Sequence, residues 1–178
     1  MADLEKILRP IDNPMEPFQA KYMQLASGET MTIRQIDRDE VPDVLVHIEP
    51  LLHVERDFYD VVAARVYSEL LAWYRHRMQD EYVFVAQIEG ELAAVVNGRQ
   101  VTPKQGMSLH TIALRRGLRV GAHAFAAKME YHIDTLGHDE ILIVAESPIG
   151  FRRWMIEYQL EKRFEVPHEL GGVPSYAL

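Results

Sequence analysis

The chain has 178 residues, no cysteine and a formal net charge of −8. This length suits one domain with a buried core, and the absence of cysteine excludes disulfides, thiolate metal sites and cysteine nucleophiles. The acidic balance argues against a general nucleic-acid coat protein, and without an apolar run of roughly 18 residues or a basic, apolar leader we expect no membrane span and a cytoplasmic location.

Residues 1–28 are expected to form an N-terminal extension or arm, because three prolines interrupt any helix there. A single domain is expected over residues 29–178. It begins with a predicted strand at 30–36, and apolar residues at helical spacing then predict helices over about 41–52 and 58–73.

Strand patterns dominate the next part of the chain. Apolar runs at 82–88 and 92–97 flank Glu89-Gly90, which predicts a β-hairpin. A loop is expected at 101–106, followed by a strand at 107–114.

The remaining elements alternate between helix and strand. A helix is predicted over 120–136, and Gly137 ends it. The unbroken apolar run at 140–145 predicts a strand that is buried on both faces. Ser147 and Pro148 suit the cap and first turn of a last helix, and strands are expected at 164–170 and 173–178.

This element order predicts an α/β (α+β) fold. The strand–helix–strand unit between residues 107 and 145 predicts a parallel pair with a right-handed connection. The hairpin before it and the strand pair after it predict a mixed sheet.

A basic segment interrupts the acidic chain. From Leu92 to Met129 there is no Asp or Glu, but there are six Lys and Arg side chains. Such a stretch indicates an anion site, unless its arginines pair with acids distant in the sequence. The informative turn is Arg115 to Gly121, where a predicted strand leads into a helix. Helix N-terminal N–H groups, glycines and forked arginine donors together suit phosphate.

The sequence of this turn resembles a known motif. Residues 116–122, Arg-Gly-Leu-Arg-Val-Gly-Ala, resemble the pyrophosphate loop of the GNAT family, the acetyl-CoA-dependent N-acetyltransferases, which usually reads Gln/Arg-x-x-Gly-x-Gly/Ala. The element order is similar to that family from about Met31 to the C-terminus. Two features depart from the motif: Arg119 replaces its first glycine, and the link Leu114-Arg115-Arg116 is shorter than usual.

The resemblance implies a GNAT-like, mostly antiparallel sheet of about six to seven strands with about four flanking helices. Strands 107–114 and 140–145 would splay apart, and the pantetheine arm of acetyl-CoA would fill the gap. The expected cofactor-binding residues are Ile112, Ala113 and Leu114 for pantetheine, and Arg115, Arg116, Gly117, Leu118, Arg119, Val120, Gly121 and Ala122 for pyrophosphate.

Amine acetylation needs a group that removes a proton from the amine and an acid for the leaving thiolate. The resemblance implies Tyr158 as that acid, although a core-edge tyrosine fits the sequence equally well. Glu146, at the end of the buried strand, and His110, on the splayed strand, are candidate bases. For His110 the sequence favours an ordinary hydrogen-bonded strand histidine over a base. No histidine spacing points to a metal site.

The leading hypothesis is an acyltransferase that moves an acetyl group from acetyl-CoA to a primary amine of a small molecule or protein. The acidic remainder of the chain favours a cationic acceptor. The alternative is a non-catalytic GNAT-like domain that binds acyl-CoA, acts as a sensor or binds a partner. Nucleic-acid binding ranks lower because the basic segment lacks interleaved aromatic residues. A homodimer would cover the edge of the C-terminal strand pair.

Overall fold

The computed structural model describes residues 14–163 and 175–177 as one mixed sheet with helices on both faces. Its strands are β1 (Lys21–Gln24), β2 (Thr30–Gln35), β3 (Glu81–Ile88), β4 (Glu91–Thr102), β5 (Gln105–Ala113), β6 (Glu140–Val144), β7 (Glu161–Arg163) and β8 (Ser175–Ala177). Its α-helices are α2 (Val41–Ile48), α3 (Tyr59–Tyr74), α4 (Val120–Glu130) and α5 (Pro148–Arg152). Short 3₁₀ turns lie at Arg38–Glu40, Glu49–His53 and Arg56–Phe58, and π-helical turns at Tyr131–Thr135 and Arg153–Glu157.

The sheet has the order β1-β2-β3-β4-β5-β6-β8-β7, and among its neighbouring pairs only β5–β6 is parallel. The predicted mixed, mostly antiparallel sheet is therefore confirmed. The described residues contain eight strands rather than six or seven. One additional strand is β1, which lies in the segment expected to be an extension and pairs antiparallel with β2. Phe18, just before it, stacks on Phe84 with ring centroids 4.1 Å apart.

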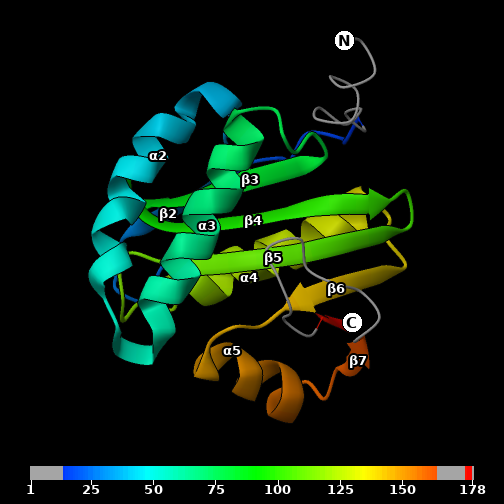
Figure 1. Cartoon of the computed structure of the whole chain (residues 1–178). Helices are drawn as coiled ribbons and strands as arrows, with labels where there is room; N and C mark the ends of the chain where they lie inside the picture. Colours follow the sequence, from blue (N-terminus) through cyan, green and yellow to red (C-terminus); the bar gives the residue numbers. More distant parts are fainter. Residues whose placement is uncertain (1–13, 164–174, 178) are drawn as a thin grey trace.

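Helices cover the sheet on both sides, with α2 and α3 on one face and α4 on the other (Figure 1). Alternate residues of β3 explain this three-layer arrangement. Val83 and Val85 pack with α2 and α3, whereas Tyr82 and Phe84 pack with α4. The middle strands are thus buried on both faces, as the apolar run at 82–88 indicates.

Several element ends differ from the sequence predictions. The loop expected at 101–106 is a tight turn, because β4 runs to Thr102 and β5 begins at Gln105. The helix expected to reach residue 136 changes to a π-helical turn after Glu130. Ser147 caps α5 as expected, since its Oγ accepts from Gly150 N–H at 3.1 Å. Of the two last strands, 164–170 lies outside the described residues and 173–178 is seen as β8.

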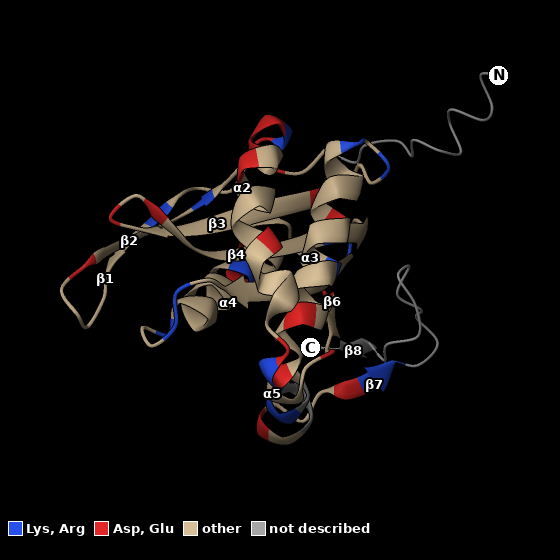
Figure 2. Cartoon of the chain, turned by 60° about the vertical axis from the view of Figure 1, so that its left-hand side comes forward, with Lys and Arg blue, Asp and Glu red and all other residues tan. Residues whose placement is uncertain are grey.

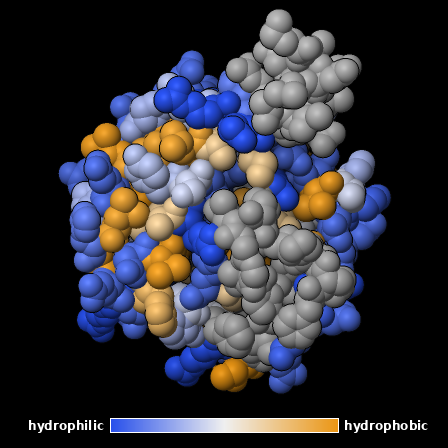
Figure 3. Space-filling view, in the orientation of Figure 1, coloured by the Kyte–Doolittle hydropathy of each residue, from blue (hydrophilic) through white to orange (hydrophobic). Residues whose placement is uncertain are grey.

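The surface over α2 and α3 is mixed, with apolar residues in separate patches between polar ones (Figure 3). Basic residues gather on the loop that leads into α4 (Figure 2). Among the described residues, no helix has the length and apolar character required to cross a bilayer.

Candidate active site

The parallel pair β5–β6 separates part-way along its length. Its last paired residues are Ser108 and Ile143, and β5 then continues to Ala113 without a partner on that side. A cavity of about 320 Å³ opens at this gap, between α3, β5, α4 and α5. A smaller cavity of about 80 Å³ lies deeper and shares several lining residues with it, including Thr111 and Phe125. The splay that the sequence predicted is therefore present and lined by four elements.

The backbone of β5 presents hydrogen-bonding groups to this gap. Leu114 N–H donates to Ala93 O of β4 at 2.8 Å, and Ala94 pairs with Ala113. Because backbone groups alternate in direction along a strand, those of Thr111 and Ala113 face the open edge. Both residues line the larger cavity. Of the expected pantetheine contacts, Ala113 therefore faces the gap. Thr111, which the sequence analysis omitted, faces it as well.

Two expected pantetheine contacts are directed elsewhere. Ile112 is 1% exposed and belongs to the core beneath α2 and α3. Leu114 gives its N–H to β4. Neither residue lines the two cavities.

The N-terminus of α4 forms another wall of the larger cavity. Gly117 and Arg119 both adopt left-handed backbone conformations, with φ of 94° and 56°, and Arg119 is the N-cap of α4. Arg119, Gly121 and Ala122 line the cavity. The first turn of a helix has N–H groups without intrahelical partners, so this wall suits an anion.

The arginines before α4 have different roles. Arg115 pairs with Glu29 at 2.8 Å, 86 positions away, and the guanidinium of Arg116 lies over the ring of Tyr59 at 4.5 Å. Arg119 makes no ion pair with a described residue and lines the cavity. Arg153 lines the same cavity from the far side. The pairing of Arg115 with a distant acid, which the sequence left open, is what the structure shows.

The other expected loop residues contribute less directly. Leu118 packs on the core and Val120 is 1% exposed. Of the six cations in the basic segment, Arg119 and Lys128 line the two cavities, whereas Lys104 pairs with Asp139 at 3.6 Å and Arg99 contacts Met78 Sδ. The basic segment is thus not a single anion site.

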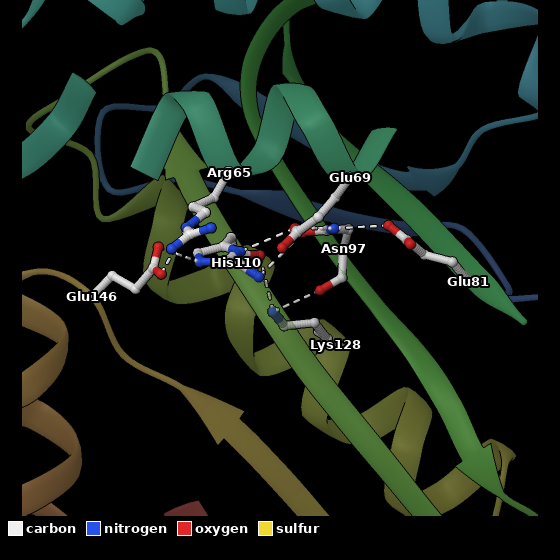
Figure 4. Close-up of polar contacts among 7 residues, drawn as sticks. All are labelled: Arg65, Glu69, Glu81, Asn97, His110, Lys128 and Glu146. Carbon is white, nitrogen blue, oxygen red and sulfur yellow. Dashed lines mark hydrogen bonds and ion pairs between the residues drawn. The ribbon is translucent and has the colours of Figure 1, made fainter. Parts of the chain in front are cut away.

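A buried ionic network closes the inner end of the gap (Figure 4). His110 lies between two carboxylates: Nδ1 is 3.0 Å from Glu69 Oε2, and Nε2 is 3.2 Å from Glu146 Oε2. Arg65 Nε donates to the other oxygen of Glu146 at 2.8 Å. The side chains of His110, Glu69 and Glu146 are at most 4% exposed.

The carboxylates determine the charge of this network. Burial alone would lower the pKa of His110, but Glu69 and Glu146 outweigh it and raise that pKa to about 9. Burial would raise the pKa of Glu146, but His110 and Arg65 together lower it. At neutral pH an imidazolium and an arginine therefore hold an ionised Glu146 at the smaller cavity, which both Glu146 and His110 line.

Asn97 extends the network away from the cavity. Its Nδ2 donates to Glu69 at 2.7 Å and to Glu81 at 2.8 Å, and its Oδ1 accepts from His110 N–H at 3.1 Å. Lys128 of α4 approaches from the opposite face of the sheet, and burial lowers its pKa to about 7 against the opposing charge of Glu69.

Comparison with known proteins gives similarity at the level of structure. No family model matches the sequence, and no curated protein is significantly similar to it. RimJ of Mycobacterium smegmatis, solved with a CoA disulfide, superposes with a TM-score of 0.58 and 11% identity over 90% of this chain and 86% of its own. The GNAT domain of PAT from S. lividans gives 0.56 and 14% over 89% and 96%.

A third similar structure is an acetyltransferase from Salmonella typhimurium, described as modifying the N-terminal serine of a ribosomal subunit protein. Its TM-score is 0.55 with 12% identity, over 83% of this chain and 94% of its own. This chain has the GNAT fold. The GNAT-like fold expected from the loop and the element order is thereby confirmed.

Two of the three expected catalytic residues meet in this GNAT fold. His110 and Glu146 are in contact at the inner end of the gap. Tyr158 follows the last π-helical turn, is 53% exposed and lines neither cavity. The structure thus does not bring Tyr158 to the other two.

The sequence analysis missed Glu69, Arg65, Asn97 and Lys128. The sequence pattern could have indicated two of them. Glu69 falls at helical spacing with Val66 and Trp73, on the apolar face of α3. Lys128 falls in the same way among the buried residues of α4. A charge on the buried face of a helix needs a partner, so it indicates a polar site. No group of three or more potential metal ligands occurs in the part of the chain that the structure describes.

Proposed function

We propose that this protein is an acyltransferase that moves an acetyl group from acetyl-CoA to a primary amine. One observation carries the proposal: the open edge of β5 leads, within one gap, from the N-terminus of α4 to the Glu146–His110 pair. An anion site, a strand-like edge and a carboxylate thus follow one another in the order that the phosphates, the pantetheine arm and the thioester require.

Binding would use all three parts of the gap. The diphosphate would lie at the first turn of α4, with Arg119 on one side and Arg153 on the other. The pantetheine amides would bond to the carbonyl of Thr111 and to the backbone of Ala113, as an added strand does. RimJ was solved with a CoA disulfide, which supports acetyl-CoA as the co-substrate.

In the transfer step the amine nitrogen attacks the thioester carbonyl carbon, a C–N bond forms and the C–S bond breaks. CoA leaves as a thiolate, which takes up a proton from water. The amine proton would pass to Glu146, directly or through a water. Arg65 and His110 hold this carboxylate in one orientation. Tyr158 has no place in this scheme because it lines neither cavity.

The acceptor is proposed to be cationic before it loses its proton. Asp57 lines the larger cavity, and its left-handed backbone, with φ of 58°, lies in the turn before α3. Glu146 lines the adjoining smaller cavity, so each of the two cavities has a carboxylate that could attract a cation. A protein N-terminal amine is one reasonable acceptor. Its pKa of about 8 leaves a larger fraction of neutral amine at pH 7 than the higher pKa of a lysine does.

A specific observation also favours the second candidate, a non-catalytic acyl-CoA-binding module. Glu146 is already bonded to two cations, which lower its pKa and weaken it as a base. In that case the gap would bind acyl-CoA without transferring the acyl group. A cytoplasmic location and a homodimer stay predictions from the sequence.

Binding and turnover can be tested separately. CoA and acetyl-CoA should each raise the melting temperature of the protein, because a bound ligand stabilises the folded state. If neither raises it, the proposed ligand is contradicted. Arg119→Gln should weaken CoA binding roughly tenfold through loss of a charged phosphate contact. Arg115→Gln is the matched control, because Arg115 pairs with Glu29. Release of CoA with a panel of small and peptide amines then separates the two candidates, since binding without release favours the module.

A further inference from the structure

The gap between β5 and β6 begins at an irregularity on the other side of β5. Along β4 and β5, Val96 pairs with Thr111 and Gly98 with Ser108, so two residues of β5, Leu109 and His110, oppose Asn97. Such a β-bulge disrupts the hydrogen-bond ladder and leaves backbone groups without their usual partners. The last β5–β6 pair also involves Ser108, so the bulge and the splay start at the same point.

Lys128 occupies the place of the missing interstrand bonds. Its Nζ donates to Asn97 O of β4 at 3.1 Å and to His110 O of β5 at 3.0 Å. The side chain comes from α4 and is 0% exposed. Burying an amino group in this way is costly unless it is hydrogen-bonded, and these two carbonyls supply the bonds.

This contact also fixes the direction of a backbone donor on the other edge of β5. The carbonyl of His110 and the N–H of Thr111 belong to one planar trans peptide group, so they point in opposite directions. With the carbonyl held toward β4 by Lys128, the N–H of Thr111 points to the open gap. Thr111 lines both cavities, next to Glu146 and His110 in the smaller one.

We propose that Lys128 is a positioning residue that aims the N–H of Thr111 at the oxygen of the thioester carbonyl. This inference rests on the proposed function. When the amine attacks, that oxygen gains negative charge, and a donor fixed in advance stabilises it more than it stabilises the ground state. Lys128 lines the smaller cavity, but its Nζ is bonded to the carbonyls of Asn97 and His110, so it acts on the thioester through the peptide group.

The first test is the variant Lys128→Met, which keeps the length of the side chain and removes its donors. We expect kcat for acetyl transfer to fall roughly 100-fold, the typical effect of losing one oxyanion donor. Affinity for CoA should change less than about threefold, because the phosphate contacts are separate. Lys128→Arg, which retains donors for both carbonyls, should recover part of kcat.

Lys104→Met serves as the matched control, since Lys104 lies in the β4–β5 turn with a side chain 70% exposed. Its kcat should equal that of the wild type. A Lys128→Met protein with wild-type kcat, or one that loses CoA affinity while kcat is unchanged, overturns the proposal.

A second test uses the wild-type protein and needs no transfer. Amide hydrogen exchange should be fast at Thr111 and slow at Ile112, whose N–H faces β4, and acetyl-CoA should protect Thr111. Equal protection of the two amides in the free protein overturns the proposal. If the exchange contrast is present but CoA neither binds nor reacts, the proposed function fails while the orientation of the Thr111 N–H stands.

Discussion

Two buried histidines near opposite ends of β5 have similar exposure, but one is charged and the other is neutral. His110, in the second half of the strand, lies between Glu69 and Glu146, and its pKa is raised to about 9. His132, in the π-helical turn after α4, packs against the start of β5, and burial lowers its pKa to about 3 with a further contribution from His138. Burial disfavours the cation at both sites, so the partners decide the outcome.

The partners of His132 are neutral groups. Its Nε2 is 2.7 Å from Tyr82 Oη, and its Nδ1 is 2.8 Å from Nδ1 of His138. Two Nδ1 atoms that face each other can share only one proton, so one ring donates and the other accepts. The neutral cluster supports the fold, whereas the charged His110 lies at the cavities. The following predictions test this contrast, from the largest expected effect to the smallest.

The largest effect is expected for His110→Ala. Removing the imidazolium leaves Glu69 and Glu146 buried without the cation between them, which should lower the free energy of unfolding by roughly 3–5 kcal/mol. Urea denaturation measures the loss. His47→Ala is the control, because His47 is exposed on α2. Equal losses in the two variants would show that His110 is not a charged partner.

The contribution of His110 should disappear in alkali. Its folded pKa is raised, so its stabilisation is complete below about pH 6.5 and is lost as the pH rises through about 9. The difference in unfolding free energy between the wild type and His110→Gln should therefore narrow by roughly 1–3 kcal/mol between pH 6.5 and 9.5. A difference that stays constant over this range would contradict a protonated His110.

His132 should affect the pH dependence of the unfolding free energy in the acidic range instead. Its folded pKa is depressed, so the unfolded chain takes up a proton near pH 6.5 while the folded ring stays neutral. Stability should fall by roughly 1–2 kcal/mol as the pH drops from 6.5 to 5, and His132→Asn should remove this part of the loss. Wild type and variant with parallel profiles would indicate that His132 is charged in the fold.

The smallest effect is expected for Tyr82→Phe. The change deletes the hydroxyl bonded to His132 Nε2 and should cost about 1 kcal/mol in unfolding free energy. Activity should be unaffected, because Tyr82 and His132 line neither cavity. A loss of activity here would mean that the two ends of β5 are coupled.

Much of the fold follows from local patterns. Helical spacing identifies α2 and α3, and the apolar run at 140–145 identifies the buried β6. The strand β1 was missed because four residues with alternating exposure are too short to distinguish from an arm. The stacking of Phe18 on Phe84 joins residues more than 60 positions apart, so tertiary contacts decide this segment.

Local sequence patterns also predicted part of the candidate site. Arg119 and Gly121 could be found because a strand, a loop and a helix adjoin in sequence. The contacts of His110 could not, since Glu69 is 41 positions before it and Glu146 is 36 after it. Contact with these two distant carboxylates changes His110 from a candidate base into a cation. Neither composition nor residue spacing reveals such contacts.

The histidine pair also restricts a residue that has no side chain, Gly106 of β5. A Cβ at Gly106 would overlap the rings of both His132 and His138. Positions 106, 132 and 138 should therefore change together among homologous sequences: a side chain at 106 is tolerated where at least one imidazole has become smaller. Such covariation would identify homologues of this chain even where the sequence of the loop before α4 has diverged.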